Sequence, residues 1–544
     1  MWALAQVEVF EEKDVVGGAC RTEYPFPKVP GLAQSTGAYL LGVLPPELKD
    51  LLGLDGVKLL RRDPHYFLPT TGEKYLLFGS DQAAMKQQFL KFFSQEDWAA
   101  NQRLQEEIGA LRDDIAPACL QEPLSLEESA ERYIRPQLRD TFVDLCRQPV
   151  SRYLDKFGFK SDLLKLLGPS TLQHVRCRCK RGAETGNSRP AGLYVPHALT
   201  SPIVLGASPP QVMYAVTDGF SGLTGGWDTP GTGMNFLVHN LCRLPGSDGT
   251  WMVVQGGMGA VTQQLATAAL HHGARIHTGQ PIQSILVGGG VARGVVTGQR
   301  REHRAPVVLV NADPFRLRQL AGEANFPAGF NARLDAMKKD GTTMKVNMAL
   351  RGLPQFKCLT EDLGQHRTTT HLLPDESTVL ESVTQAFEDV RQGRLPEFPT
   401  IEVYYQTTVD PSIQDASRQH HSAALFVQWV PFELAGTSWE AEEERYVEHL
   451  IGILDRFAPG AKDLVVDTFT LTPPKVESYF GISRGHIHHI DNSFGFTDRF
   501  PYSTPIQGLY SCSAGCHPAG SVMGCAGHNA ASRIIADLGL RRWW

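Results

Sequence analysis

GLYSCSAGCHPAGSVMGCAGHNAASRII, residues 508–535, reads as a short apolar strand, a glycine-rich turn and a helix of small residues that starts near Val522. The start of a helix offers unpaired backbone N–H groups and the positive end of the helix dipole. We expect Gly515, Gly520, Gly524 and Gly527 to keep side chains away from an approaching ligand. Such a site suits a pyrophosphate or the N1–C2=O edge of a reduced flavin. The alternative is a glycine-rich turn ahead of an ordinary packed helix.

The other end of the chain points to the same kind of ligand. Residues 7–18, VEVFEEKDVVGG, predict a strand over 7–10 that ends in the carboxylate of Glu11. In a dinucleotide-binding unit, an acidic residue at this place accepts hydrogen bonds from the adenosine ribose. Gly17 and Gly18 then let the backbone pass close to phosphate groups, where a Cβ atom would collide.

Both ends resemble the phytoene-desaturase-like FAD oxidoreductases, a family of carotenoid desaturases and isomerases. The resemblance extends to three internal segments, residues 255–314, 409–432 and 472–496, which contain QGGMGAVTQQL, DPSIQDASRQHH and GISRGHIHHIDNSFGF. It implies an α/β fold, in which a Rossmann-like FAD-binding domain is joined to a discontinuous α+β substrate domain built on an antiparallel sheet. It also implies a flavin-dependent enzyme with FAD as cofactor.

The resemblance divides the chain into interleaved segments. Residues 1–35, 250–320 and 490–544 are expected to form the FAD-binding domain, and residues 36–249 and 321–489 the substrate domain. Residues 168–212 are rich in arginine and proline and keep no helical or strand period, so we interpret them as a disordered or aberrant insert. Cys177 and Cys179 lie there, but a CxC pair without a second pair is weak evidence for zinc.

One expected unit is missing from the sequence. Members of the family open with a strand, a GxGxxG turn and a helix, and only then reach the acidic strand. Here residues 1–6 correspond at most to the end of that helix. The missing strand belongs in the centre of a parallel sheet, and its turn carries diphosphate contacts. We therefore expect an incomplete gene model or a short isoform that binds FAD poorly as written and has little activity.

The middle segment predicts further cofactor contacts. After Gly256 and Gly257, an amphipathic helix is expected with Val261, Leu265 and Leu270 on its buried face. Strands are expected over 275–277, 281–287 and 307–310, the last of them in a parallel sheet. The resemblance implies that Gly256, Gly257 and the strand around Ile282 lie against the cofactor, with Asn311 and Ala312 beside it. We expect Asp313 to be only a turn residue.

The chemistry is expected to rest mainly on the flavin, which takes a hydride from the substrate. His517 is the candidate catalytic side chain, while Gly515, Gly520, Ser521 and Val522 would present backbone to the cofactor. His486, His488 and His489 form a second cluster, for which a packed or surface role is favoured over a metal site. The family's usual HPGGG turn is HPAGS here, so tight flavin contact is in doubt. The CxxxC spacing of Cys512 and Cys516 argues against a thiol relay.

The substrate domain is expected to contain helices over 81–93 and 98–115 and sheet strands over 344–350 and 423–430. The resemblance implies an apolar small-molecule substrate. Amine oxidation would instead need an aromatic pair facing the flavin, for which Tyr404, Tyr405 and Trp429 are available.

Composition adds a few limits. The net charge of −6 argues against a nucleic-acid partner, and the 10 cysteines at irregular spacing suggest reduced thiols. No apolar run is long enough for a transmembrane helix, although peripheral membrane contact stays open. The resemblance implies a location in the mitochondrial matrix, where a protein partner is also conceivable. The alternative function is a catalytically silent relative that acts as a mitochondrial regulator or scaffold through protein contacts.

Overall fold

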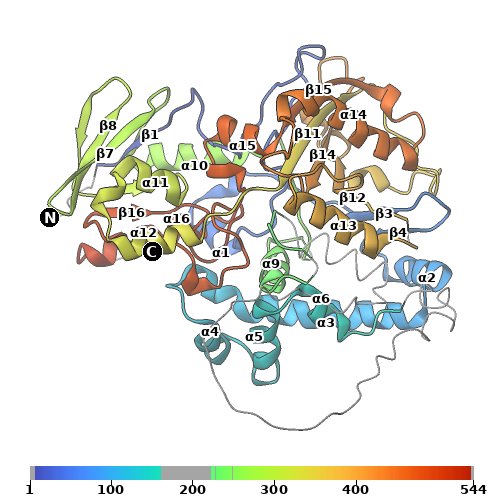
Figure 1. The fold of residues 1–544 in the computed structure, drawn as a ribbon. Helices are drawn as coiled ribbons and strands as arrows, with labels where there is room; N and C mark the ends of the chain where they lie inside the picture. The colour runs from blue at the N-terminus through green and yellow to red at the C-terminus, as the bar shows by residue number, and fades with distance from the viewer. Residues whose placement is uncertain (1–5, 161–221, 227, 248, 376, 541–544) are drawn as a thin grey trace, which may run out of the picture.

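Two parallel strand pairs join parts of the chain that lie far apart in the sequence. The computed structural model describes residues 6–160, 222–226, 228–247, 249–375 and 377–540 (Figure 1). In it β1 (Glu8–Phe10) pairs with β6 (Arg275–His277), and β10 (Val308–Val310) pairs with β16 (Leu509–Ser511). The strands predicted near these positions are therefore confirmed. Within the described ranges no strand connects the two pairs. The pairs link the three predicted cofactor segments, while the domain boundaries stay a prediction.

The helix expected after Gly257 is α10 (Gly259–His271), and it leads into β6. The predicted buried face is only partly correct. Val261 is buried, but Leu265 and Leu270 are 37% and 54% exposed. The reason is that the first turn of α10 packs on a core containing Met258 and Val261, whereas no described residue covers the two leucines.

A three-stranded antiparallel sheet stands beside the second parallel pair and is seen at the left of Figure 1. It consists of β7 (Ile282–Gly288), β8 (Val291–Thr297) and β9 (Glu302–Arg304). Its buried residues share a core with β10, β16 and the helices α11 (Pro314–Ala321) and α12 (Ala328–Ala336). The final helix, α16, spans Cys525–Asp537 and so begins three residues later than expected.

The second large unit is a seven-stranded sheet in which only β12 and β3 pair in parallel. In spatial order its strands are β15 (Val465–Leu471), β11 (Thr343–Leu350), β14 (His421–Gln428), β13 (Thr400–Tyr405), β12 (Thr369–Leu372), β3 (Tyr66–Pro69) and β4 (Tyr75–Phe78). The two strands predicted for this sheet are thus confirmed, with ends shifted by one or two residues. One face packs on α14 (Trp439–Phe457) through an apolar core.

A helical region lies below both units in Figure 1. The predicted helices are confirmed as α2 (Gln82–Phe92) and α3 (Gln95–Ile115), capped by the side chains of Asp81 and Ser94. The other α-helices of the described chain are α1 (Pro46–Leu51), α4 (Leu126–Tyr133), α5 (Arg139–Arg147), α6 (Val150–Asp155), α9 (Thr232–His239), α13 (Val379–Arg391) and α15 (Pro473–Phe480). The short strands β2 (Leu59–Leu60) and β5 (Val253–Val254) pair with each other.

Two sequence predictions concern regions or properties that the fold limits. The insert predicted over 168–212, with Cys177 and Cys179, lies almost entirely outside the described residues. Among the helices that are described, none is both long enough and apolar enough to span a bilayer.

Candidate functional site

The turn between β16 and α16 is held in place by a single asparagine. Asn492 accepts a hydrogen bond of 2.8 Å from the amide of Gly520 and donates one of 3.0 Å to its carbonyl. The helix that follows has Gly524, in the left-handed region, as its N-cap, and no side chain caps it. The backbone amides at the start of α16 are therefore available to an anionic or carbonyl acceptor, as the sequence predicts.

The glycines of this turn serve different purposes from those expected. A Cβ at Gly515 would lie 2.8 Å from Pro314, and one at Gly520 would lie 2.5 Å from the backbone of His488. A Cβ at Gly524 would lie 2.9 Å from Leu48. These three glycines therefore allow close packing of the protein on itself. Only Gly527 has open space within 4 Å, so the predicted clearing of side chains applies to that position alone.

His517 is buried and held in one orientation. Its Nε2 lies 3.0 Å from the carbonyl oxygen of Ala118, and the edge of its ring meets Phe496. Nδ1 is buried without a partner among the described residues. Burial lowers the pKa of His517 to about 4, so the ring is neutral at pH 7. With Nε2–H donating to the carbonyl, Nδ1 remains an acceptor next to the turn.

Glu11 follows β1 directly, as predicted, and is half-buried. Its Oε1 accepts a hydrogen bond of 2.9 Å from the amide of Lys13. Gly17 and Gly18 both have positive φ. A Cβ at Gly17 would lie 2.9 Å from the carbonyl of Cys20, whereas Gly18 faces open space. Gly18 is therefore the residue of this pair whose bare backbone a ligand can approach.

Three distant parts of the chain meet at the turn. Cys20, Val261 and Val522 belong to one apolar cluster, which links the segments after β1, at α10 and before α16. Thr22 ties the first two together, because its hydroxyl donates to the carbonyl of Gly256 and accepts from the amide of Gly259, both at 3.0 Å. Gly257 packs against Thr22 as well.

The remaining predicted residues lie around the second strand pair. Asn311 and Ala312 follow β10, and Asn311 Oδ1 lies 3.8 Å from the sulfur of Cys512 in the turn. Ile282 begins β7 in the separate three-stranded sheet. Ser521 is half-buried beside Val522. Asp313 caps α11 and accepts a hydrogen bond from the amide of Ser483, which confirms its structural role.

A buried polar surface, which the sequence analysis missed, lies on the face of the seven-stranded sheet opposite α14. Glu402 stands at its centre: Oε2 accepts a hydrogen bond of 2.6 Å from the hydroxyl of Tyr39, and Oε1 lies 3.4 Å from Nε2 of His371. Burial raises the pKa of Glu402, but His371 and Tyr39 lower it by more, so the carboxyl remains ionised at pH 7. The fully desolvated guanidinium of Arg62 is close by and donates to Thr369.

Lys345 occupies the same surface. Its Nζ donates hydrogen bonds to the carbonyl oxygens of Ser35 and Gly37 and lies over the rings of Tyr39 and Tyr404 at 4.9 and 5.2 Å. Burial holds the pKa of Lys345 well below its usual range. The two tyrosine rings stack face to face, 3.8 Å between centroids. The aromatic pair of this site is therefore Tyr39 with Tyr404, because Tyr405 belongs to the opposite core.

One signal in the sequence could have found these residues. Lys345 and Glu402 interrupt apolar strands, in TMKVNMAL and TIEVYY, at positions that alternate with core residues. A charged residue inside a strand that is buried on both faces is a candidate for a functional role.

The histidine cluster also differs from its prediction. His486 and His488 are buried, and His486 Nε2 lies 3.4 Å from the carboxylate of Asp491. Asp491 also accepts hydrogen bonds from the amides of Ser493 and Thr224. The expected absence of a carboxylate near these histidines is thus wrong, because the bend at 489–491 folds Asp491 back. In the part of the chain that is described, no three potential ligands are grouped for a metal ion.

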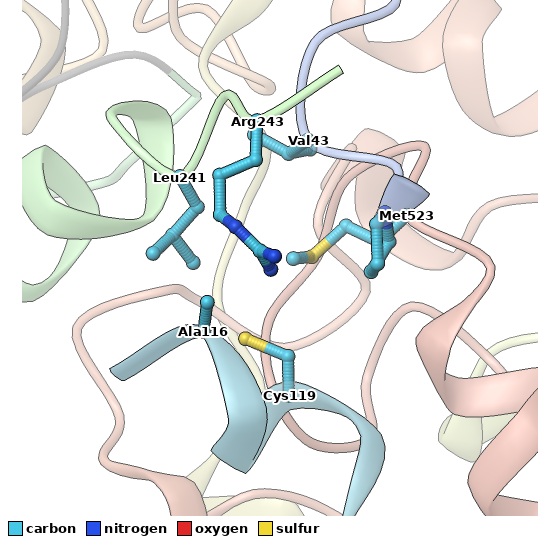
Figure 2. A pocket seen from close by; sticks show the side chains of 7 residues that line it. Val43, Ala116, Cys119, Leu241, Arg243 and Met523 are labelled. Carbon is cyan, nitrogen blue, oxygen red and sulfur yellow. The ribbon is translucent and has the colours of Figure 1, made fainter. Parts of the chain in front are cut away.

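Two hollows near these elements are not suited to hold the cofactor. Figure 2 shows Arg243, Cys119 and Met523 converging on a cavity of about 10 Å³, room for one water molecule at most. A groove of about 880 Å³ lies at the amino ends of β10 and β16, where Gln507, Leu509 and Arg293 line it. The turn at 512–524 follows the carboxyl end of β16, so this groove is on the other side of the strand pair.

Comparison with known proteins gives the following matches. The model of the family "Flavin containing amine oxidoreductase" matches residues 5–351. The mouse "Pyridine nucleotide-disulfide oxidoreductase domain-containing protein 2" is 32% identical over 97% of this chain and 89% of its own length. The "zeta-carotene-forming phytoene desaturase" of Myxococcus xanthus is 26% identical over 48% of this chain and 45% of its own length. A putrescine oxidase structure, 15% identical, covers 98% of this chain and 93% of its own, with a TM-score of 0.52.

Proposed function

We propose that this chain, which belongs to the flavin containing amine oxidoreductase family, oxidises an apolar substrate by passing hydride from a substrate carbon to FAD. Family membership makes the chain a flavin-dependent oxidoreductase of α/β fold with FAD as its cofactor. The apolar substrate, and a chemistry closer to phytoene desaturases than to amine oxidases, are the proposal. A mitochondrial location and any protein partner are also only proposed, on the resemblance alone.

The residues present fit FAD. The uncapped start of α16 supplies backbone donors, and Gly18 and Gly527 have open space where a Cβ would otherwise stand. Glu11 supplies a carboxylate at the end of β1, as the ribose of a dinucleotide requires. Glu11, Gly18 and the 517–524 turn would therefore hold the adenosine, phosphate and ring portions, respectively. When bound, FAD supplies the acceptor for the hydride.

The closed stack of Tyr39 and Tyr404 carries the proposal of an apolar substrate. With 3.8 Å between ring centroids and 4° between planes, no substrate group fits between the rings. Lys345 already lies over both rings, at the position where a cationic amine would gain from their electrons. The site thus lacks the open aromatic pair that amine oxidation was expected to need. Two listed relatives are named for phytoene and limonene, which are hydrocarbons.

The chain's own side chains would handle the proton that leaves when a substrate is desaturated. Glu402 is ionised and hydrogen-bonded to Tyr39, so this pair can take up one proton at the sheet face. Nδ1 of His517 is a second acceptor, next to the turn. The surrounding residues Phe426 and Ile487 pack with Tyr39 and Tyr404 and would exclude water from the reacting carbon.

The test is an anaerobic reduction assay on the FAD-loaded full chain. Phytoene and limonene are the apolar probes and putrescine is the amine probe, each followed by loss of the oxidised flavin's visible absorbance. Bleaching by an apolar probe with no response to putrescine supports the proposal. Bleaching by putrescine alone overturns it in favour of amine oxidation.

A further inference from the structure

A fully buried arginine lies behind the predicted flavin turn. Arg499 is 2% exposed, and its guanidinium donates to four backbone carbonyl oxygens. These are Cys516 at 3.0 Å and Ala514 at 2.9 Å in the turn, and Ile490 at 2.9 Å and Asp491 at 3.1 Å in the preceding bend. A side chain with donors in a planar fork can make such a set of bonds, and lysine cannot.

The charge of Arg499 is solvated but not neutralised. Within the described residues, no carboxylate forms an ion pair with it at 4 Å or less. The nearest acidic side chain, Asp491, is engaged by His486, Lys339 and the amides of Ser493 and Thr224. Carbonyl dipoles lower the energy of a buried cation without removing its net charge, so its field extends into the neighbouring low-dielectric interior.

The groups around the turn respond to this field. Burial lowers the pKa of His517 and of His489 to about 4, and Arg499 lowers both further. Burial raises the pKa of the Cys516 thiol to about 11, and Arg499 acts in the opposite direction on that group. Cations are disfavoured and anions favoured on both sides of the turn. The dipole of α16, whose first residue is Cys525, has the same sign there.

We propose that Arg499 fixes the geometry of the turn at 514–517 and supplies the buried positive charge that raises the reduction potential of the flavin bound there. The inference rests on the proposed function, which places FAD at this turn. Hydride transfer adds two electrons and one proton to the cofactor, so the reduced form carries one more negative charge than the oxidised form. A nearby buried cation therefore stabilises the reduced form more than the oxidised form.

The test compares the FAD-loaded wild-type chain with R499Q and R499K. R499Q removes the charge, while R499K keeps the charge and loses the four-carbonyl geometry. The midpoint potential is measured by equilibrium dye titration, together with flavin content and thermal midpoint. R301Q, at an exposed position of the hairpin, is the matched control.

The expected result is a lower potential for R499Q, a potential near the wild-type value for R499K, and a reduced thermal midpoint for both. If R499Q yields no flavin-loaded protein, R499K decides: an unchanged potential supports the proposal, and a fall to lower potential overturns it. A wild-type chain without flavin overturns the proposed function and this inference with it. A loaded wild-type chain whose potential R499Q leaves unchanged overturns this inference alone.

Discussion

The hydroxyl of Tyr39 donates a hydrogen bond of 2.6 Å to Oε2 of Glu402. Tyr39 comes from the irregular segment after the first glycines, and Glu402 from the middle of β13. The bond therefore ties the chain next to the predicted cofactor site to the polar face of the large sheet. Burial raises the pKa of Tyr39 well above its usual value, and the charge of Glu402 adds to this effect. The tyrosine accordingly keeps its proton and remains the donor.

Tyr39→Phe should destabilise the protein by about 1–3 kcal/mol, because it leaves the buried carboxylate of Glu402 without a donor. Urea unfolding at pH 7 measures the change. Tyr24→Phe is the matched control, since Tyr24 is 71% exposed and should unfold like the wild type. Equal stability of the two variants would contradict the role given to the Tyr39 hydroxyl.

Lys345→Met should change how stability depends on pH. Because burial holds the pKa of Lys345 well below its usual range, the unfolded chain binds a proton there that the folded chain does not. The free energy of unfolding should therefore rise with pH up to about 10.4, with a slope from this group of about 1.4 kcal/mol per pH unit. Urea unfolding between about pH 7 and about pH 9.5 should show that Lys345→Met lacks this contribution. Lys338→Met, at an exposed position, should retain the wild-type slope.

Gly17→Ala and Gly18→Ala should have opposite effects on folding and cofactor retention. At Gly17 the new methyl group would lie 2.9 Å from the carbonyl of Cys20, so the thermal midpoint should fall clearly. At Gly18 there is open space, so only the cost of positive φ, about 1 kcal/mol, should appear. If FAD phosphates approach Gly18, its alanine variant should lose flavin on gel filtration while remaining folded. Full flavin content in a folded Gly18→Ala protein would remove Gly18 from the site.

His517→Gln should make the protein less sensitive to acid. Burial lowers the pKa of His517 to about 4, below its value in the unfolded chain. Its contribution to stability is therefore complete above about pH 6.5 and is lost as the pH falls toward 4, by up to about 3 kcal/mol. Unfolding midpoints between about pH 7 and about pH 4.5 should decline less steeply in His517→Gln than in the wild type. His271→Gln, at an exposed position of α10, should follow the wild-type curve.

Much of the fold could be predicted from local pattern. The strand before Glu11, the helix α10 and the strands β6, β10 and β16 all follow from periodicity and turn residues that lie close together in the sequence. The turn and the helix α16 were predicted in the same way, with the start of the helix three residues too early. Where the pattern misled, the cause was tertiary. Leu265 and Leu270 have the spacing of a buried face, but nothing described covers them.

The purpose of the glycines could not be predicted in the same way. Gly515 and Gly520 look like residues that make room for a ligand, yet Pro314 and His488 fill that room. Both neighbours are at least 25 residues away in the chain, and nothing in the local sequence identifies them. A glycine reports that some atom comes close, but only the packed structure shows which atom.

The sequence alone determined the kind of site: a glycine-rich turn before a helix, a carboxylate at the end of a strand, and motifs that led to a flavin-dependent family. These are short-range features, because a helix start or a strand end is set by neighbours along the chain. Tertiary structure decided which charged groups share a buried space. Lys345, Glu402 and Tyr39 meet on one sheet face, and Arg499 reaches four carbonyl groups from two segments. Such contacts depend on strand order and on how distant segments pack, and that information is spread over the whole chain.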